Sequence, residues 1–396
     1  MQLTKILKGK NLWLSLLPLT LALCILFSFI SISLTQTFLF LSLVFWLIVL
    51  FQKKAHLSFP SFFWPLIGYA ALSLVSSFFS VKPETSLKDS RELLLYLIVP
   101  IAYAGFSKEK EISRANLALL ASAYLSTLYS FFYFFFKASP GERIKGFMGH
   151  YMTQAGLLLL FCSVALSMVF FSRNKIKFLW GLGFLFALFA LTLTQTRSAW
   201  IGMVVASTLI LLLYKPKTLI IVPVALGLFF LASPQHIKKR ALSIFSSRSY
   251  SNRMRVEYTK AGIKIIRDFP LFGTGPDTVD MVFQNLKYGL SEEAKRNVHL
   301  HNNFIQIAAE RGILTLLVWL IFLGWTFISL FGLLKNKDPS LYPLTVAALA
   351  ALFALVTEGF FEYNFADSEI TTLFLYLLTI PFSLFRIQKI REEKFS

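Results

Sequence analysis

Long apolar runs separated by short charged segments constrain this chain more than any other feature of its sequence. A helix needs about 20 mainly apolar residues to cross the hydrocarbon core of a bilayer. Hydrophobic residues make up 56% of the 396 positions and charged residues only 15%, whereas ordinary soluble domains have about 25% charged residues. The pattern predicts an all-α, polytopic integral membrane protein. It excludes a soluble enzyme, a nucleic-acid-binding protein and a disordered chain.

Twelve runs are long enough, or nearly long enough, to be transmembrane helices. Their approximate ranges are 12–31, 35–51, 62–79, 93–106, 115–136, 151–171, 178–195, 199–213, 218–232, 313–334, 341–359 and 370–385. The fourth, eighth and ninth are short, so we expect them to be tilted, extended by flanking residues or only partly spanning. The chain is predicted to have three parts: nine spans in 1–232, one large hydrophilic loop at 233–312, and three spans with a tail in 313–396.

The distribution of lysine and arginine over the short loops predicts the orientation. Cytoplasmic loops of membrane proteins carry an excess of these residues. Counting alternate loops gives one basic-rich side, which includes Lys5, Lys8 and Lys10 before the first run and Arg386, Lys389, Arg391 and Lys394 after the last. Both termini are therefore predicted to be cytoplasmic, with the large loop on the outer face.

The large outer loop contains a basic amphipathic segment. Residues 254–267 place Val256, Ile263 and Ile266 among basic residues, a pattern typical of a helix that lies at the lipid surface. The proline and glycines of 269–276 are expected to end this helix. Binding of anionic headgroups alone would explain such a loop.

Basic residues also occur in three other outer loops, at 80–92, 137–150 and 195–198. The topology rule disfavours basic residues on the outer side of a membrane. Arginines and lysines contributed by several loops of one face therefore predict a convergent anion-binding site.

Arg197 is a strong single candidate for that site. It lies in the sequence TQTRSAW between two apolar runs, and an arginine at membrane depth suggests function. Its planar guanidinium group matches phosphate oxygens and stays charged at physiological pH. The simpler alternative is an arginine that extends to the interface beside Trp200.

His301 opens a second group of residues. It precedes a helical pattern for which Asn302 or Asn303 is the expected N-cap. The positive end of a helix dipole favours the neutral imidazole that a general base requires. An interfacial, hydrogen-bonded histidine is the simpler alternative. Further along the same predicted helix, Gly312 and Thr315 are expected to share a face with Ala308, where small residues would admit another helix.

Metal ligation is not expected from this sequence. His299 and His301 could form part of a metal site, but no third ligand has suitable spacing. Acidic residues near the last outer loop could bind a cation or sugar hydroxyls, or they could be solvated helix ends. These residues are Glu358, Glu362, Asp367 and Glu369.

Four stretches of the sequence resemble bacterial O-antigen ligases, within the wider O-antigen ligase and polymerase family. They are His301-Asn302 followed by Gly312 and Thr315, TQTRSAW around Arg197, RVEYTKAGIKIIRDFPLFGTG from Arg255, and RIKGFMGHYMTQAGLLLL from Arg143. The resemblance implies a GT-C-like membrane glycosyltransferase of about twelve spans in the bacterial inner membrane. Its active site would face the periplasm. It would transfer a glycan from undecaprenyl pyrophosphate to a sugar of the lipid A core, with inversion and without a metal or other cofactor.

The resemblance also implies roles for individual residues. Arg197 and Arg255 match required arginines of the family, with Arg253 as a close competitor of Arg255, and His301 matches its essential histidine. A pyrophosphate leaving group develops negative charge that arginines or a metal must stabilise. We therefore predict that Arg197 and Arg255 clamp the pyrophosphate and that His301 is the general base. The predicted additional pyrophosphate contacts are Arg143, Arg91, Lys88 and Arg253.

Three other functions fit parts of the pattern. An O-antigen polymerase would use the same donor with a lipid-linked glycan as acceptor, but members of that type tend to have two large outer loops. A protein-glycosylating ligase is a further relative. A transporter or flippase for a lipid-linked anion belongs to another class, and it predicts charges deep within spans and inverted repeats. Neither feature is clear in this sequence.

Overall fold

The structure, a computed structural model, describes residues 12–54, 57–139 and 141–393, and their regular secondary structure is helical throughout. This confirms the predicted all-α class. The first half contains α2 (Leu12–Phe27), α3 (Ile32–Phe51), α4 (Phe63–Phe78), α5 (Pro83–Asp89), η1 (Ser90–Leu97), α6 (Ile98–Gly105), α7 (Glu109–Phe136), α8 (Tyr151–Phe171), α9 (Lys177–Leu193) and α10 (Arg197–Tyr214). The second half contains η2 (Pro216–Ile220), α11 (Ile221–Ala232), α12 (Gln235–Leu242), α13 (Tyr250–Asp268), α14 (Val279–Val282), η3 (Leu286–Tyr288), η4 (Ala294–Arg296), α15 (Asn303–Arg311), α16 (Ile313–Leu333), α17 (Leu341–Glu358) and α18 (Ser368–Glu393).

Every predicted apolar run is helical in the structure, although fewer than twelve helices meet the length and composition expected of a full span. Seven described helices are long and apolar enough to cross a membrane, and they are α3, α7, α8, α10, α16, α17 and α18. Four shorter apolar segments are α2, α4, α9 and η2–α11. The run at 93–106 is a 3₁₀ helix, η1, followed by the short α6. The number twelve therefore stays a prediction for the spans.

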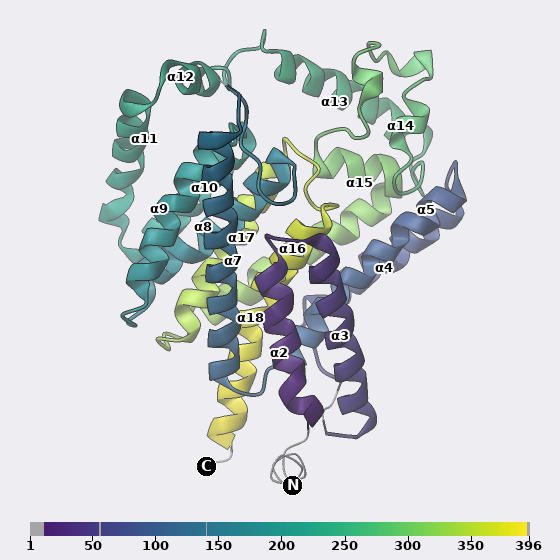
Figure 1. The fold of residues 1–396 in the computed structure, drawn as a ribbon. Helices are drawn as coiled ribbons and strands as arrows, with labels where there is room; N and C mark the ends of the chain where they lie inside the picture. The colour runs from purple at the N-terminus through teal and green to yellow at the C-terminus, as the bar shows by residue number, and fades with distance from the viewer. Residues whose placement is uncertain (1–11, 55–56, 140, 394–396) are drawn as a thin grey trace.

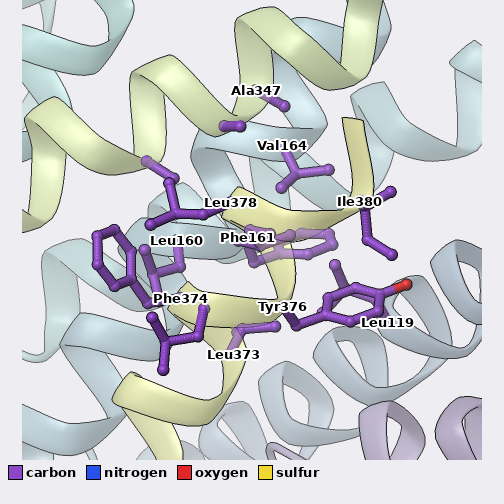
Figure 2. Close-up of a cluster of buried hydrophobic side chains, with 14 of the residues drawn as sticks. Leu119, Leu160, Phe161, Val164, Ala347, Leu373, Phe374, Tyr376, Leu378 and Ile380 are labelled. Carbon is purple, nitrogen blue, oxygen red and sulfur yellow. The ribbon is translucent and has the colours of Figure 1, made fainter. Parts of the chain in front are cut away.

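The centre of the bundle is formed by α8, α17 and α18, most of whose residues are buried. Figure 2 shows Phe161 and Val164 of α8 packed against Phe374 and Leu378 of α18, with Ala347 of α17 nearby. α11 lies at the edge of the bundle (Figure 1) and has no buried residue. α8, α17 and α18 are thus largely buried, whereas α11 packs loosely at the edge, beside the candidate site.

Successive long helices alternate in direction, so several loops distant in sequence meet at one end of the bundle (Figure 1). The helices α12 to α15 cover this end, and the loops at 137–150, 194–196 and 359–367 lie beneath them. α2 begins and α18 ends toward the opposite end. Lys5, Lys8, Lys10 and Lys394, which contribute to the predicted orientation, lie outside the described residues.

The expected helix through Gly312 is wrong in one respect. α15 ends at Arg311 and α16 begins at Ile313, and Gly312 between them has φ +85°. A Cβ at Gly312 would lie 1.9 Å from the carbonyl oxygen of Leu271. Gly312 is therefore required for a break and for close approach of the 269–276 turn, and it does not share a continuous helical face with Thr315.

Candidate functional site

The turn between α9 and α10 holds two arginines from other parts of the chain. Arg143, in the loop before α8, donates from Nε to the carbonyl oxygen of Thr194 (2.7 Å) and from Nη2 to Thr196 Oγ1 (2.9 Å). Arg240, in α12, donates from Nε to the carbonyl oxygen of Gln195 (3.1 Å). Because Thr194 and Gln195 are consecutive, one short turn brings the two guanidinium groups together.

Arg197 follows this turn and binds both the end of α12 and the first turn of α13. Its Nη1 donates to the carbonyl oxygen of Ser243 (2.5 Å) and to Ser243 Oγ (2.9 Å). Its Nη2 donates to Ser251 Oγ (2.5 Å) and Asn252 Oδ1 (2.7 Å). With 5% of its surface exposed, Arg197 does not extend to the interface as the simpler alternative required. Its terminal nitrogens instead hold the segment that connects Arg240 to Arg255.

Arg255 and His301 are both held by the loop between α17 and α18. Arg255 donates from Nε to the carbonyl oxygen of Phe361 (3.0 Å). The next residue, Glu362, places Oε1 2.9 Å from His301 Nδ1. Phe361 and Glu362 therefore bring the amphipathic helix α13 and the segment before α15 to one place.

His301 has an unusual backbone conformation, with φ +49°. Non-glycine residues in the left-handed region are uncommon, and such residues occur often at functional sites. The following residue, Asn302, is the N-cap of α15, as predicted: its Oδ1 accepts from the backbone nitrogen of Ile305 (3.0 Å). On the other side of the imidazole, Asn297 Nδ2 lies 2.6 Å from His301 Nε2.

The three arginines Arg143, Arg240 and Arg255, called the arginine cluster below, affect one another electrostatically. The pKa of Arg143 is lowered to about 10, first by burial and then by the positive charges of Arg240 and Arg255. Burial also lowers the pKa of Arg255, and Arg240 lowers it further. Within the described residues, none of the three forms an ion pair with a carboxylate. The cluster therefore retains net positive charge at neutral pH.

Glu362 is the acidic residue that this charge affects most clearly. Burial by itself raises the pKa of a carboxyl group. Interactions with His301, which include a hydrogen bond, and the positive charge of Arg255 nevertheless lower the pKa of Glu362 to about 2. Glu362 is thus ionised throughout the physiological range.

An apolar cavity of about 470 Å³ lies next to the arginines. It is enclosed by α8, α9 and α10 on one side and by α11 and α12 on the other. Its lining includes Leu188, Trp200, Val204, Ala225, Phe229 and Ile244. Ile244 directly follows Ser243, the residue that Arg197 binds, so the cavity reaches the polar site. An amphipathic ligand with an anionic head and an apolar tail fits this combination.

The other predicted site residues are distributed differently. Arg253 is exposed on α13, whereas Arg255 faces the α17–α18 loop, so the geometry favours Arg255 for the cluster. Lys88 in α5 and Arg91 in η1 are exposed and belong to the α4–α5 side of the molecule (Figure 1). The structure does not bring them to the arginine cluster. Thr315 is buried and bonds within α16, to the carbonyl oxygen of Arg311 (2.6 Å).

Two residues of the site were not identified as such from the sequence. Arg240 was one of several basic residues in HIKKR, and no local signal distinguishes it from its neighbours. The sequence suggests a cation ligand, a hydroxyl ligand or a solvated helix end for Glu362, whereas its partner in the structure is His301. The available sequence signal was that Glu362 is an acidic residue soon after the apolar run of α17.

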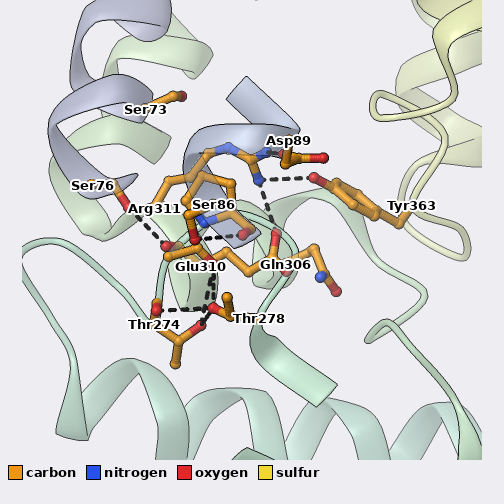
Figure 3. Close-up of polar contacts among 12 residues, drawn as sticks. Ser73, Ser76, Ser86, Asp89, Thr274, Thr278, Gln306, Glu310, Arg311 and Tyr363 are labelled. Carbon is orange, nitrogen blue, oxygen red and sulfur yellow. Dashed lines mark hydrogen bonds and ion pairs between the residues drawn. The ribbon is translucent and has the colours of Figure 1, made fainter. Parts of the chain in front are cut away.

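A second arginine site lies under the outer helices, where charges are paired and buried (Figure 3). Arg311 Nη1 lies 2.9 Å from Glu310 Oε2 and donates to the hydroxyl oxygen of Tyr363 (2.9 Å), and its Nη2 lies 3.4 Å from Asp89 Oδ2. Ser76 Oγ donates to the carbonyl oxygen of Glu310 (3.0 Å). These contacts connect α4, α5, α15 and the α17–α18 loop into one rigid unit.

The central part of the chain is similar to a known protein family. Residues 182–320 match the family model described as O-antigen ligase. The match begins within α9 and ends within α16, and it includes Arg197, Arg240, Arg255 and His301. Arg143 and Glu362 lie outside it. No curated protein matches the chain.

Proposed function

We propose that this member of the O-antigen ligase family is a ligase that transfers a glycan from undecaprenyl pyrophosphate to a sugar of the lipid A core. The observation that carries the proposal is the arginine cluster, which has no carboxylate partner in the part of the chain that the structure describes and lies beside His301 and an apolar cavity. The reaction would take place on the periplasmic face of the bacterial inner membrane, with both termini in the cytoplasm.

The arginine cluster supplies the charge that a diphosphate leaving group needs. Each arginine uses Nε to bind a backbone carbonyl, which orients the guanidinium plane. The Nη groups of Arg240 and Arg255 make no hydrogen bond to other described residues, so they can bind phosphate oxygens. Charge-assisted hydrogen bonds of this kind strengthen as negative charge develops in the transition state.

The contacts of Arg197 support a different role from the predicted phosphate clamp. All its terminal donors bind the α12–α13 segment, so Arg197 supports the site by holding Arg240 and Arg255 in register. Direct contact with phosphate falls to Arg240, Arg255 and Arg143. Lys88, Arg91 and Arg253 have no part in the proposal, because they lie apart from the cluster or face away from it.

The apolar cavity accounts for the lipid part of the donor. A polyprenyl chain is apolar along its whole length, and because it comes from lipid that is equally apolar, close packing against the lining is what would hold it in the cavity. The cavity lies between α10 and the peripheral α11 and ends close to Arg197. The chain would therefore enter from the lipid side while the diphosphate meets the arginine cluster.

His301 is placed to act on the acceptor. In the proposed step the acceptor hydroxyl oxygen forms a bond to the anomeric carbon, and its proton moves to His301. The bond from the anomeric carbon to the diphosphate oxygen breaks, and its electron pair stays on the diphosphate. Attack opposite the leaving group inverts the anomeric centre. The role of the base is worth about 10² to 10⁴ in rate in enzymes generally.

The test is a reconstituted reaction with defined substrates. The purified protein in nanodiscs is incubated with an undecaprenyl-pyrophosphate glycan and lipid A core, with and without EDTA. We expect a covalent glycan–lipid A core product that does not depend on divalent metal. Lengthening of the donor glycan would indicate a polymerase, glycosylation of a protein acceptor a protein ligase, and transport without a new bond a flippase. Each of these outcomes would overturn the proposal.

A further inference from the structure

The imidazole of His301 is held on both sides, and the two contacts together identify its basic nitrogen. Nδ1 lies 2.9 Å from Glu362 Oε1, and Nε2 lies 2.6 Å from Asn297 Nδ2. A neutral imidazole has one N–H donor and one acceptor nitrogen. The orientation of the Asn297 amide therefore decides which nitrogen carries the proton.

Backbone contacts fix that orientation. The backbone nitrogen of Val298 donates to Asn297 Oδ1 (3.0 Å), and Asn297 Nδ2 donates to the carbonyl oxygen of His299 (3.3 Å). Turning the amide over would place an NH₂ group against the N–H of Val298 and an oxygen against the carbonyl of His299. Both bonds would become repulsive contacts. Asn297 thus presents an N–H donor to His301, and Nε2 accepts it.

With Nε2 as the acceptor, Nδ1 carries the hydrogen and donates it to Glu362. Glu362 is well suited to accept it, because only 5% of its surface is exposed and its Oε2 has no hydrogen-bond partner in the described part of the chain. Its Oε1 also accepts a longer bond from the backbone nitrogen of Tyr363 (3.3 Å). His301 is therefore the principal partner that offsets the burial of this carboxylate.

We propose that Glu362 is a positioning residue that holds His301 as the Nδ1–H tautomer and makes Nε2 the nitrogen that accepts the proton. The inference rests on the proposed transferase function. During the reaction the acceptor hydroxyl takes the place of the Asn297 amide at Nε2 and transfers its proton there. The resulting imidazolium keeps its Nδ1–H bond to the Glu362 carboxylate. Glu362 does not touch the substrates.

Other charged and titratable groups surround this pair. α13 contributes Arg255 and Tyr258, whose ring centroid is 5.6 Å from that of His301. His299 lies on the same segment, with its ring 5.3 Å from His301. His150 and Arg143 approach from the loop before α8. Only Glu362 among these groups makes a hydrogen bond to His301, so its replacement should have a distinct effect.

The first test replaces Glu362 with glutamine, which keeps the size of the side chain and removes its charge. A carboxylate beside an imidazole favours the imidazolium form and raises its pKa. For Glu362→Gln we expect kcat at pH 7.5 to fall tenfold or more, with little change in the KM for the acceptor. The acidic limb of the kcat–pH profile should move down by about one pH unit or more. The matched control, Asp367→Asn, removes a carboxyl group of the same loop that has no contact with His301, and it should leave the limb in place.

The second test makes the opposite change. Asn297→Asp would place a carboxylate at Nε2 in addition to Glu362 at Nδ1. Both nitrogens would then be held as donors, so the imidazolium would be stabilised and the acidic limb should move to higher pH. A role of Glu362 in folding alone would lower the yield or the rate without moving the limb in opposite directions in the two variants.

A third measurement needs no turnover. Nitrogen-15 spectra of histidine-labelled protein, assigned by comparison with His301→Ala, report the tautomer directly. We expect the Nδ1–H tautomer for His301 at pH 8. An Nε2–H tautomer, or acidic limbs that stay unchanged in both variants, would overturn the inference while leaving the proposed function intact. Full activity of His301→Ala would instead overturn the proposed role of His301 itself.

Discussion

Two arginine sites, Arg311 and the arginine cluster, lie at the end of the bundle that the outer helices cover, and they differ in their partners. Arg311 lies between Asp89, Glu310 and Tyr363, in a closed buried network. Arg143, Arg240 and Arg255 bind backbone carbonyl oxygens through Nε and have no carboxylate partner among the described residues. The charge of Arg311 is therefore compensated within the protein, whereas that of the cluster is available to a ligand.

The charge of its partners distinguishes a structural arginine from one that can bind an anion. Breaking a buried ion pair by removing one partner leaves an uncompensated charge and is strongly destabilising. Removing an arginine that has only neutral partners leaves no such charge. Substitutions in the two groups should therefore affect different properties: the stability of the fold in one and the binding of an anion in the other.

The largest expected effect is at Arg311. Arg311→Ala should lower the free energy of unfolding by about 3–5 kcal/mol, because Asp89 and the buried Glu310 both lose their positively charged partner. Burial raises the pKa of Glu310 to about 7, although the charge of Arg311 acts to lower it. The additional change Glu310→Gln should therefore restore part of the stability. Thermal unfolding in nanodiscs measures both, and a stable single variant would contradict the structural role.

Arg255 should show the opposite result. For Arg255→Ala we expect normal folding but a loss of about 10- to 100-fold in kcat/KM for the donor, which corresponds to about 1.5–3 kcal/mol for hydrogen bonds to a charged group. The control is Arg253→Ala, two positions away and exposed, which should change kcat/KM less than twofold. An equal loss of kcat/KM in the two variants would contradict a specific role for Arg255.

A smaller effect is expected in the apolar cavity. Ala225 of α11 lines it, so Ala225→Trp should occupy the space of the polyprenyl chain and raise the KM for a long-chain donor about tenfold. A donor with a short prenyl chain should be affected much less. Val224→Trp is the control, because Val224 is 52% exposed on the same helix and is not part of the lining. A similar rise for both donors would argue against a tail in this cavity.

The smallest effect is expected at Lys88 and Arg91. The sequence predicted them as pyrophosphate contacts, but both are exposed on the α5 side of the molecule. Replacing both with alanine should change donor affinity less than twofold. A loss comparable to that of Arg255→Ala would show that the anion site extends further than the arginine cluster.

The sequence was sufficient to predict the elements that depend on local patterns. The long apolar runs predicted helices, and hydrophobic periodicity predicted the amphipathic helix α13. The position of Asn302 and Asn303 before a helical pattern predicted one of them as the N-cap, and it is Asn302. The sequence did not predict the break at Gly312, because the spacing of Ala308, Gly312 and Thr315 fits one continuous helical face. The close approach of Leu271 that requires this glycine is a tertiary contact between distant segments.

The candidate site was predictable only in part, for a related reason. Arg197 and His301 stand out because a charged or titratable residue borders an apolar run. Arg240 and Glu362 become recognisable only from their partners, Gln195 and His301, which are 45 and 61 positions away in the chain. Sequence spacing contains no information about such pairs. The sequence also could not show that Arg197 binds protein groups in place of phosphate, because those partners, Ser243, Ser251 and Asn252, are 46 to 55 positions away.

The role of the arginine cluster in binding the diphosphate is tested most directly by measuring the affinity of the protein for undecaprenyl pyrophosphate in nanodiscs of zwitterionic lipid. We compare the wild type with the double variant Arg240→Gln, Arg255→Gln, after confirming by thermal unfolding that the variant is folded. We expect at least a 100-fold weaker affinity for the variant, and a wild-type affinity that decreases as salt increases. Equal affinity of the two folded proteins would contradict the claim that the unpaired arginines hold the diphosphate.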